Sequence, residues 1–229
     1  NAGHPSVGSP VGSAFGHWKF DEGYGDNTNN SGSSGSALNG NLEGACPGVA
    51  TCPTWTNDGK YSKALSYDGG DYLQVPDDNA FNYPDNNFTF TGWFKTGNTG
   101  VRNAIVTRAT VAPYIMLFVY TDDRLWLETK DSGATYVSAI TPTGTNYHDN
   151  QWHHFAAIRS DTLDKLLLYV DGVLMVTTDD TRTGNFDIAA TMRIGRDTGA
   201  NYFNGTIDEI KAYSYVLTAD EVKVDYNLG

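Results

Sequence analysis

Short segments of alternating hydrophobic and polar residues run along most of the chain, and Gly, Asn and Asp separate them. Residues 88–95 show the pattern clearly, because Phe88, Phe90 and Phe94 recur at even spacing. A period of two is typical of a strand with one buried face. The pattern predicts strands at 17–21, 64–67, 72–75, 88–95, 104–107, 114–120, 124–130, 136–140, 152–160, 165–170, 173–177, 192–194 and 206–213. So many short strands predict an all-β sandwich.

Turn residues predict how some of these strands connect. An Asp-Gly-Gly-Asp sequence lies at 68–71 and an Asp-Gly pair at 171–172, and each predicts a β-hairpin. The one clear helix signal is Thr218 followed by Glu221, which forms a capping box before Val222. We therefore expect a short helix of one or two turns at the C-terminal end.

Composition divides the chain into an arm and one folded domain. Residues 1–14 are dominated by Gly, Ser and Pro and predict a flexible arm or linker. Residues 15–229 contain no second linker and no internal repeat, which predicts a single domain.

The charge of the chain excludes some partners. With 15 basic and 27 acidic residues, the formal net charge is −12. A negative surface repels phosphate backbones, so we do not expect a nucleic-acid partner. No apolar run approaches the ~18 residues of a membrane-spanning helix, so membrane insertion is not expected.

The two cysteines lie close together in the sequence. Cys46 and Cys52 flank a short Gly/Pro loop that can bring their sulfur atoms to bonding distance. Two ligands alone make a poor zinc site. The favoured interpretation is a structural disulfide, which indicates an oxidising compartment and a secreted or cell-surface protein. The alternative is two free thiols in a cytosolic loop.

Five groups of motifs together resemble one known family. In chain order they are Trp-Lys-Phe-Asp-Glu-Gly at 18–23, the paired segments 64–69 and 71–75, Phe-Thr-Gly-Trp-Phe-Lys at 90–95, Gln-Trp-His-His-Phe-Ala at 151–156 with 168–172, and 194–195 with 203–210. The chain resembles the laminin-G-like, concanavalin-A-like lectin/glucanase domains of the bacterial type. The resemblance implies a jelly-roll β-sandwich of two curved antiparallel sheets. It also implies binding of carbohydrate or protein, although relatives on this fold are glycosidases or polysaccharide lyases.

Large aromatic residues in these motifs are expected to form the core. Sandwich cores are built from inward-facing aromatic and aliphatic side chains of both sheets. The residues expected between the sheets are Trp18, Phe20, Trp93, Trp152 and Phe155.

Enzyme chemistry has weak support in the sequence. A glycosidase needs two carboxylates on one face, and the five Glu residues offer no clear acid/base pair. A polysaccharide lyase needs a cation near the uronate together with His or Tyr for proton transfer. Residues that could supply these groups are Arg108, Tyr114, Tyr120, Arg124, Trp126 and His148, and the alternative is that they are ordinary sheet residues.

One strand predicts a surface for sugar binding. In segment 124–130, Leu125 and Leu127 are expected on one face, and Arg124, Trp126 and Glu128 on the other. The competing interpretation is that Trp126 packs inside and the leucines face outward. Further candidate ligand-binding residues are Arg108, Tyr114, Tyr120, Tyr136, Tyr147 and Tyr202, with Tyr147 and Tyr202 at the sandwich rim.

Acidic residues near two strand ends predict a metal site. Alternation with Phe20 places Glu22 on the inner face, and alternation with Ile210 places Asp208 there as well. Two inward carboxylates repel each other, and a cation or protonation would relieve them. The resemblance implies a structural calcium ion, with Asp21 and Asp26 as further ligands. The alternative is that these carboxylates cap backbone amides.

The sequence thus predicts a non-catalytic carbohydrate-binding module of a secreted or cell-surface protein, with a structural calcium ion. Its expected partner is a polysaccharide or other glycan. The protein itself is expected to be a monomer or part of a larger multidomain chain. A polysaccharide lyase and a protein-binding adhesion module are the alternatives.

Overall fold

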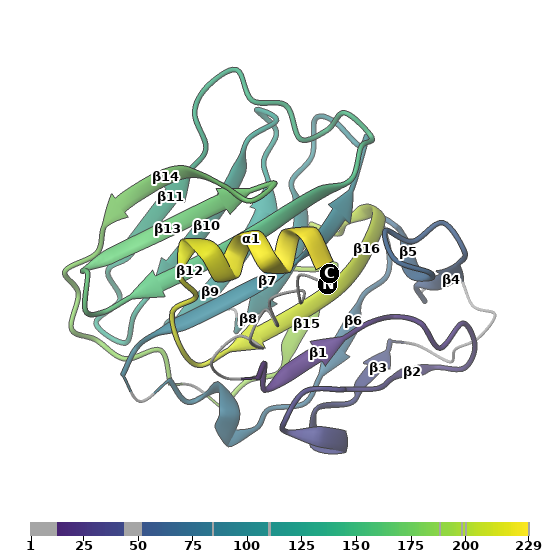
Figure 1. Cartoon of the computed structure of the whole chain (residues 1–229), viewed down its shortest axis with the longest axis horizontal. Helices are drawn as coiled ribbons and strands as arrows, with labels where there is room; N and C mark the ends of the chain where they lie inside the picture. Colours follow the sequence, from purple (N-terminus) through teal and green to yellow (C-terminus); the bar gives the residue numbers. More distant parts are fainter. Residues whose placement is uncertain are drawn as a thin grey trace, which may run out of the picture.

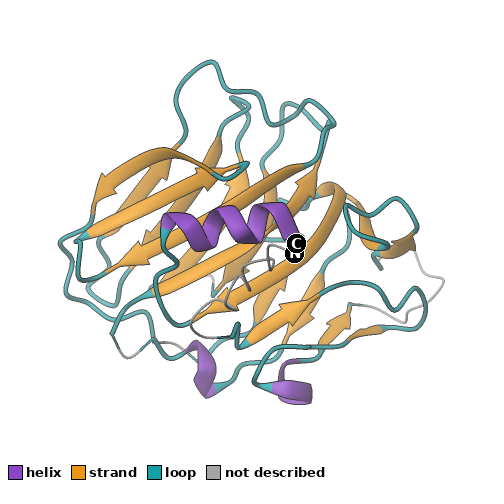
Figure 2. Cartoon of the chain, in the orientation of Figure 1, coloured by secondary structure: helices purple, strands orange, loops and turns teal. Residues whose placement is uncertain are grey.

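The computed structural model describes residues 13–43, 52–83, 85–109, 111–187, 189–197, 199 and 201–228. Across these residues the strands form two eight-stranded antiparallel sheets, here named sheet A and sheet B. Strands make up most of the regular structure (Figure 2). The predicted jelly-roll β-sandwich is confirmed.

Sheet A contains the longest strands and one branch. Its order is β14 (Val173–Asp179), β13 (Lys165–Val170), β12 (His153–Ser160), β7 (Phe88–Lys95), β16 (Asn204–Tyr213), β5 (Ala64–Asp68) and β4 (Thr54–Thr56), and β1 (Gly16–Trp18) also pairs with β16.

Sheet B lies behind sheet A in Figure 1. Its order is β11 (Tyr136–Ile140), β10 (Leu125–Lys130), β9 (Tyr114–Val119), β8 (Asn103–Arg108), β15 (Met192–Ile194), β6 (Leu73–Val75), β3 (Gly40–Leu42) and β2 (Asn27–Thr28). Two short 3-10 helices, η1 (Gly35–Leu38) and η2 (Asn79–Phe81), join the strands at one side.

The hydrophobic core fills the space between the two sheets. Phe90 and Phe94 of β7 and Phe155 of β12 enter it from sheet A, and Leu117 and Leu127 enter it from sheet B. Each of these side chains is almost fully buried. The alternating positions that predicted the strands are therefore the positions that face the opposite sheet.

One predicted hairpin is confirmed and the other is wrong. Strands β13 and β14 pair with each other across Asp171 and Gly172, which both have the positive φ that this turn requires. Strand β5 pairs with β16 in sheet A, whereas β6 pairs with β15 in sheet B. The turn at 68–71 therefore crosses between the sheets, and the buried carboxylate of Asp71 holds it by accepting a 3.1 Å hydrogen bond from Asp68 N.

The C-terminal helix α1 (Ala219–Leu228) is longer than the predicted one or two turns. The capping box is present, because Thr218 N donates to Glu221 Oε2 at 2.7 Å and Glu221 N donates to Thr218 Oγ1 at 3.3 Å. The helix crosses in front of β12, β7 and β16 on the outer face of sheet A (Figure 1). Its Val222 packs there against Ile158 and Tyr213.

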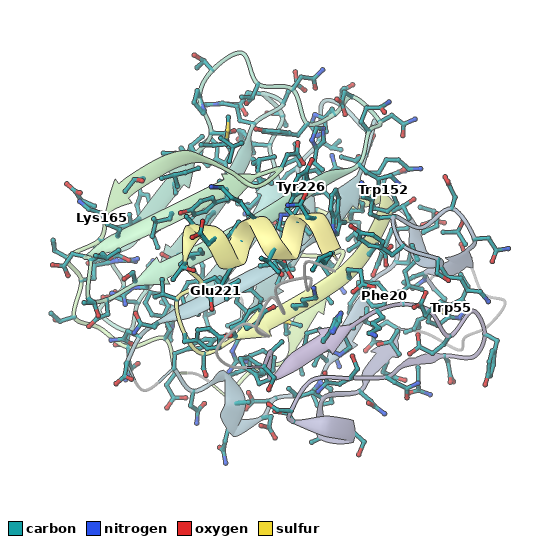
Figure 3. All side chains as sticks on the ribbon, viewed as in Figure 1. Phe20, Trp55, Trp152, Lys165, Glu221 and Tyr226 are labelled. Atoms are coloured by element: carbon teal, nitrogen blue, oxygen red, sulfur yellow. The ribbon has the colours of Figure 1, made fainter. Side chains whose placement is uncertain are left out.

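Two core expectations are wrong, those for Trp93 and Trp152. Trp93 is buried on a different side of the sheet. It faces α1 on the outer side of sheet A, and its ring stacks on Tyr226 at 5.4 Å between centroids. Tyr226 is labelled on α1 in Figure 3, which also shows Trp152 away from the helix. Trp152 is half-buried with Lys95 Nζ 5.2 Å from its ring, so it too lies outside the main core. Trp18, Phe20 and Phe155 are core residues as predicted.

Candidate functional site

The side chains of β10 alternate between the two faces of sheet B, as the predicted sugar-binding surface requires. Leu125 and Leu127 are fully buried toward sheet A, whereas Trp126 and Glu128 are half-buried on the outer face of sheet B. The described residues form one α-helix, α1, and it packs on sheet A. No α-helix of the described chain therefore covers the outer face of sheet B. The alternative in which Trp126 packs inside the sandwich is therefore wrong.

Aromatic rings form a continuous cluster around Trp126. Its ring stacks on Phe118 of β9 at 5.8 Å and lies 5.0 Å from Tyr120, which is 37% exposed. The guanidinium of Arg124 lies 5.5 Å from the Trp126 ring, and that of Arg102 lies 3.6 Å from the Phe118 ring. Cations over aromatic faces hold such rings in place. We name Trp126, Phe118, Tyr120, Arg102 and Arg124 the aromatic platform.

Polar groups at the sides of the platform are ordered by hydrogen bonds. Tyr114 Oη donates to Glu128 Oε1 at 2.7 Å. Burial, together with this hydrogen bond, raises the pKa of Tyr114 to about 12, so the phenol stays a neutral donor. Arg124 Nε donates to Asp122 Oδ2 at 2.8 Å. Partial burial raises the pKa of Asp122, but the hydrogen bonds from Arg124 outweigh it, and the pKa is lowered overall.

An open cleft of about 520 Å³ adjoins the platform. Four connections that are far apart in sequence form it: the turn at 68–71, the β7–β8 loop, the β9–β10 turn and the β15–β16 loop. The lining residues are Gly69, Asn98, Gly100, Val101, Arg102, Tyr120, Thr121, Asn201 and Tyr202. The cleft thus brings together Tyr120 and Tyr202, which the sequence proposed separately.

Buried polar residues tie the cleft loops together. Asn103 Nδ2 donates to the carbonyl oxygen of Asn98 at 2.7 Å, and Asn103 Oδ1 accepts from Asn204 N at 3.2 Å. The ring of His148 bridges Asn103 (3.1 Å) and Asp123 (2.7 Å). Because Asn103 and His148 are buried, these bonds fix the relative positions of the loops before any ligand binds.

Two predicted ligand-binding residues are structural instead. The guanidinium of Arg108 is 1% exposed, pairs with Asp77 at 3.0 Å and stacks over Phe81 at 4.5 Å. Tyr147 belongs to the core and packs against His153 at 5.1 Å. Of the six groups considered for a lyase, Arg108 and His148 are buried, whereas the other four lie on or beside the aromatic platform.

The four predicted calcium ligands do not converge. Among the described residues, no three His, Cys, Asp or Glu side chains are placed to hold one metal ion. Asp208 accepts hydrogen bonds from Tyr61 N at 3.0 Å and Glu209 N at 2.9 Å, and Asp21 accepts from Lys63 N at 3.1 Å. These two carboxylates hold the β4–β5 connection. Burial raises the pKa of Asp208 to about 7.

The inward placement of Asp208 is also wrong. Glu209 has φ of 51°, and the pairing with β7 shifts between Asp208 and Lys211. Because this bulge breaks the alternation, Ile207 and Ile210 both face the core, whereas Asp208 pairs with Trp93 on the α1 side.

Glu22 and Asp26 lie elsewhere, at one hollow of about 280 Å³. Asn27 and Asn29 also line it, and Asn29 N donates to Glu22 Oε1 at 2.7 Å. Glu22 Oε2 is buried and accepts no hydrogen bond within the described part of the chain. An oxygen-rich hollow with such an unpartnered carboxylate oxygen fits a hard cation.

The predicted disulfide is not tested by the structure. Cys46 lies outside the described residues, and the Cys46–Cys52 pairing stays a prediction.

Sequence reasoning missed the loop residues of the site, namely Asn98, Arg102 and Asn201. They lie in loops, where the sequence has no hydrophobic periodicity. Only the folded structure shows that these loops meet at one cleft. The Gly-rich composition of 97–100 indicates a loop but carries no information about what lies opposite.

The protein is thus a two-sheet β-sandwich with α1 on the outer face of sheet A, and with the aromatic platform and the cleft on the side of sheet B. The model of the concanavalin A-like lectin/glucanases superfamily matches residues 67–223. The chain belongs to this superfamily.

Solved structures share the fold. Domain 4 of AbnA, an extracellular GH43 arabinanase from Geobacillus stearothermophilus solved with arabinotriose, has a TM-score of 0.72 and 19% identity, covering 95% of this chain and 99% of that one. The binding domain of Paraclostridial Mosquitocidal Protein 1 has a TM-score of 0.73 and 18% identity, covering 94% of this chain. The binding domain of botulinum neurotoxin serotype G has a TM-score of 0.72 and 12% identity, again covering 94%.

The chain spans 52% and 51% of the two toxin domains, about half their length. Among curated protein sequences, none matches the chain. No described helix is long and apolar enough to cross a membrane.

Proposed function

We propose that the protein is a non-catalytic carbohydrate-binding module of a secreted or cell-surface protein, and that it binds glycans at the aromatic platform and the adjoining cleft. The observation that carries this proposal is the arrangement of Trp126, Tyr120 and Tyr202 along one open surface, with amide and guanidinium groups beside them. Sugar rings stack on aromatic faces, and amides and charged groups bind their hydroxyls.

The arabinanase domain supports a polysaccharide as the ligand. It is a structural neighbour of matching length, and it was solved with arabinotriose. We therefore choose arabinan and arabinotriose as the first ligands to test, followed by an array of plant and bacterial glycans.

Replacement of Trp126 by Ala tests the platform. We expect glycan affinity to fall about ten- to hundredfold, corresponding to ~1–3 kcal/mol, because the stacking surface is lost. The melting temperature should change little, since Trp126 is half-buried and lies outside the core between the sheets. Affinity gel electrophoresis and a melting curve measure the two effects.

The matched control is Tyr24→Ala. Tyr24 is 81% exposed on the β1–β2 connection, so removing its ring should leave binding unchanged. Equal affinity of wild type and the Trp126→Ala variant would move the site, and Tyr202→Ala then tests the cleft alone. Failure of every glycan to bind would leave the protein-binding alternative.

A structural calcium ion is part of the proposal, at the hollow beside Glu22 and Asp26. A chelator should lower the melting temperature of the wild-type protein, because an ion that binds only the folded state stabilises it by ~2.7 kcal/mol at a hundredfold excess over Kd. Glu22→Gln should abolish this chelator effect. Asp208→Asn should retain it, because Asp208 is bonded to backbone amides on the α1 side. A melting temperature that a chelator does not change would exclude the ion.

A further inference from the structure

Two arginines differ from all the others in the chain. Arg102, Arg108, Arg124, Arg159 and Arg182 each lie within 4.0 Å of a carboxylate oxygen. Within the part of the chain that the structure describes, Arg193 and Arg196 have no carboxylate partner. In a protein with 27 acidic and 15 basic residues, ion pairing is the usual state of an arginine, so its absence is informative.

Both of these arginines contact the same aromatic ring. The guanidinium carbon of Arg193 lies 5.8 Å from the centre of the Tyr72 ring, and that of Arg196 lies 4.8 Å from it. Arg196 also lies 4.9 Å from the ring of Tyr202, and Tyr72 lies 6.5 Å from Tyr202. The two tyrosine rings therefore hold two cationic groups in a small area. We name Tyr72, Arg193, Arg196 and Tyr202 the arginine patch.

The arginine patch borders the cleft on the outer face of sheet B. Tyr202 lines the cleft directly. Arg193 pairs with Thr107 of β8, Thr107 pairs with Met116 of β9, and Met116 pairs with Glu128 of β10. One row across sheet B thus joins the patch to Glu128, which lies beside the platform, over three strand spacings or roughly 15 Å. A chain of a few sugar residues can span that distance.

The nearby acid does not neutralise the patch. Asp197 follows Arg196 in sequence, but it is fully buried and accepts two hydrogen bonds from Asn201 Nδ2, at 3.1 and 2.9 Å. It also faces Arg102 Nε at 3.3 Å. The Nε atoms of Arg193 and Arg196 are buried, and neither has a hydrogen-bond partner among the described residues.

From this arrangement we propose that the site selects glycans that carry carboxylate groups, with the uronate bound by Arg193 and Arg196. The inference rests on the proposed glycan-binding function and names its substrate class. A guanidinium presents parallel N–H donors that match the two oxygens of a carboxylate. The net charge of −12 repels polyanions as a whole, so any preference for an acidic glycan has to come from local contacts of this kind.

The experiment compares matched neutral and acidic polymers. Polygalacturonate and alginate are each tested beside a carboxyl-reduced form of the same polymer, with arabinan as a neutral reference and dextran sulfate as a sulfated one. We expect at least one polyuronate to bind about tenfold or more tightly than its reduced form. This preference should shrink as salt is added.

Variants locate the preference. Arg193→Gln with Arg196→Gln should remove the preference, so that the carboxylated polymer binds no more tightly than its reduced form. The control is Lys19→Gln with Lys223→Gln, which changes the net charge equally at two exposed positions outside the patch and should preserve the preference. Arg193→Lys with Arg196→Lys keeps the charge but loses the planar donors, so the preference should fall part of the way.

The outcomes separate the two proposals. Equal binding of carboxylated and reduced polymers overturns the inference and leaves the glycan-binding function intact. Tighter binding of dextran sulfate than of both polyuronates overturns the carboxylate assignment. Failure of all polymers to bind, arabinan included, overturns the glycan-binding function itself, and the inference with it.

Discussion

Asp180→Asn is expected to destabilise the fold by ~3–5 kcal/mol, because it removes the negative charge between two buried arginines. Asp180 is fully buried, and its carboxylate accepts hydrogen bonds from Arg159 Nε at 3.0 Å and Arg182 Nε at 2.6 Å. Arg182 also donates to Thr129 Oγ1 of β10 at 2.6 Å, whereas Arg159 belongs to β12. The carboxylate therefore joins the two sheets at one end of the sandwich. Chemical denaturation measures the loss.

The same residue predicts how stability depends on pH. Burial raises the pKa of Asp180, but hydrogen bonds and charge from Arg182 and Arg159 outweigh it, so the folded-state pKa is lowered. A carboxylate whose pKa is lowered in the folded state stabilises the fold at pH values above its unfolded-state pKa of about 3.9. This contribution is lost as the pH falls through the folded-state pKa. As the pH falls from about 5 to about 2, the wild-type protein should therefore lose more stability than the Asp180→Asn variant.

Asp179→Asn is the control for this prediction. Asp179 is the next residue, with a side chain that is 81% exposed and paired with Lys165 at the surface. Exposed pairs contribute little, so the free energy of unfolding should stay close to that of wild type. Similar effects of the two substitutions would contradict the assigned role of Asp180.

Trp93→Ala is expected to cost ~3–5 kcal/mol and to loosen α1. The indole is buried between sheet A and the helix, with Tyr226 at 5.4 Å, His154 at 5.2 Å and Lys60 Nζ 3.9 Å from its ring. Its removal leaves a cavity under α1 and takes away the surface on which Tyr226 stacks. Amide hydrogen exchange of residues 219–228 should accelerate in the variant.

Trp152→Ala makes the same chemical change away from the helix. Trp152 is half-buried beside Lys95, so its loss should cost less and should leave exchange in α1 unchanged. Slow exchange of α1 in the Trp93→Ala variant would show that other contacts hold the helix. The next residue to replace would then be Asp225, whose carboxylate is hydrogen-bonded to His154 and Lys211.

The sequence correctly predicted features that depend on residues close together in the chain. The alternation of Leu125, Trp126 and Leu127 placed Trp126 on the correct face, because each strand residue points opposite to its neighbours. The capping box at Thr218 and the turn at 171–172 were likewise predictable from residues that contact each other within a few positions.

Other features depend on partners that the sequence does not reveal. The turn at 68–71 has the composition of a hairpin turn, and only the pairing of β5 and β6 with different sheets shows that it crosses between them. The bulge at Glu209 reverses the face of Asp208, so alternation failed there. Arg108 looked available for a ligand because its carboxylate partner, Asp77, lies 31 residues away.

The placement of α1 and the aromatic platform on opposite sides of the sandwich fixes how the protein can be attached to a sensor chip or bead. Asp220, in the first turn of α1, has a side chain that is 96% exposed. A linker joined at this position lies on the outer side of sheet A and leaves the far face open to large polymers. Coupling at Lys130 of β10 has the opposite effect, because this residue shares the face of Trp126 and Glu128. The site of attachment therefore decides whether an immobilised molecule can reach its ligand.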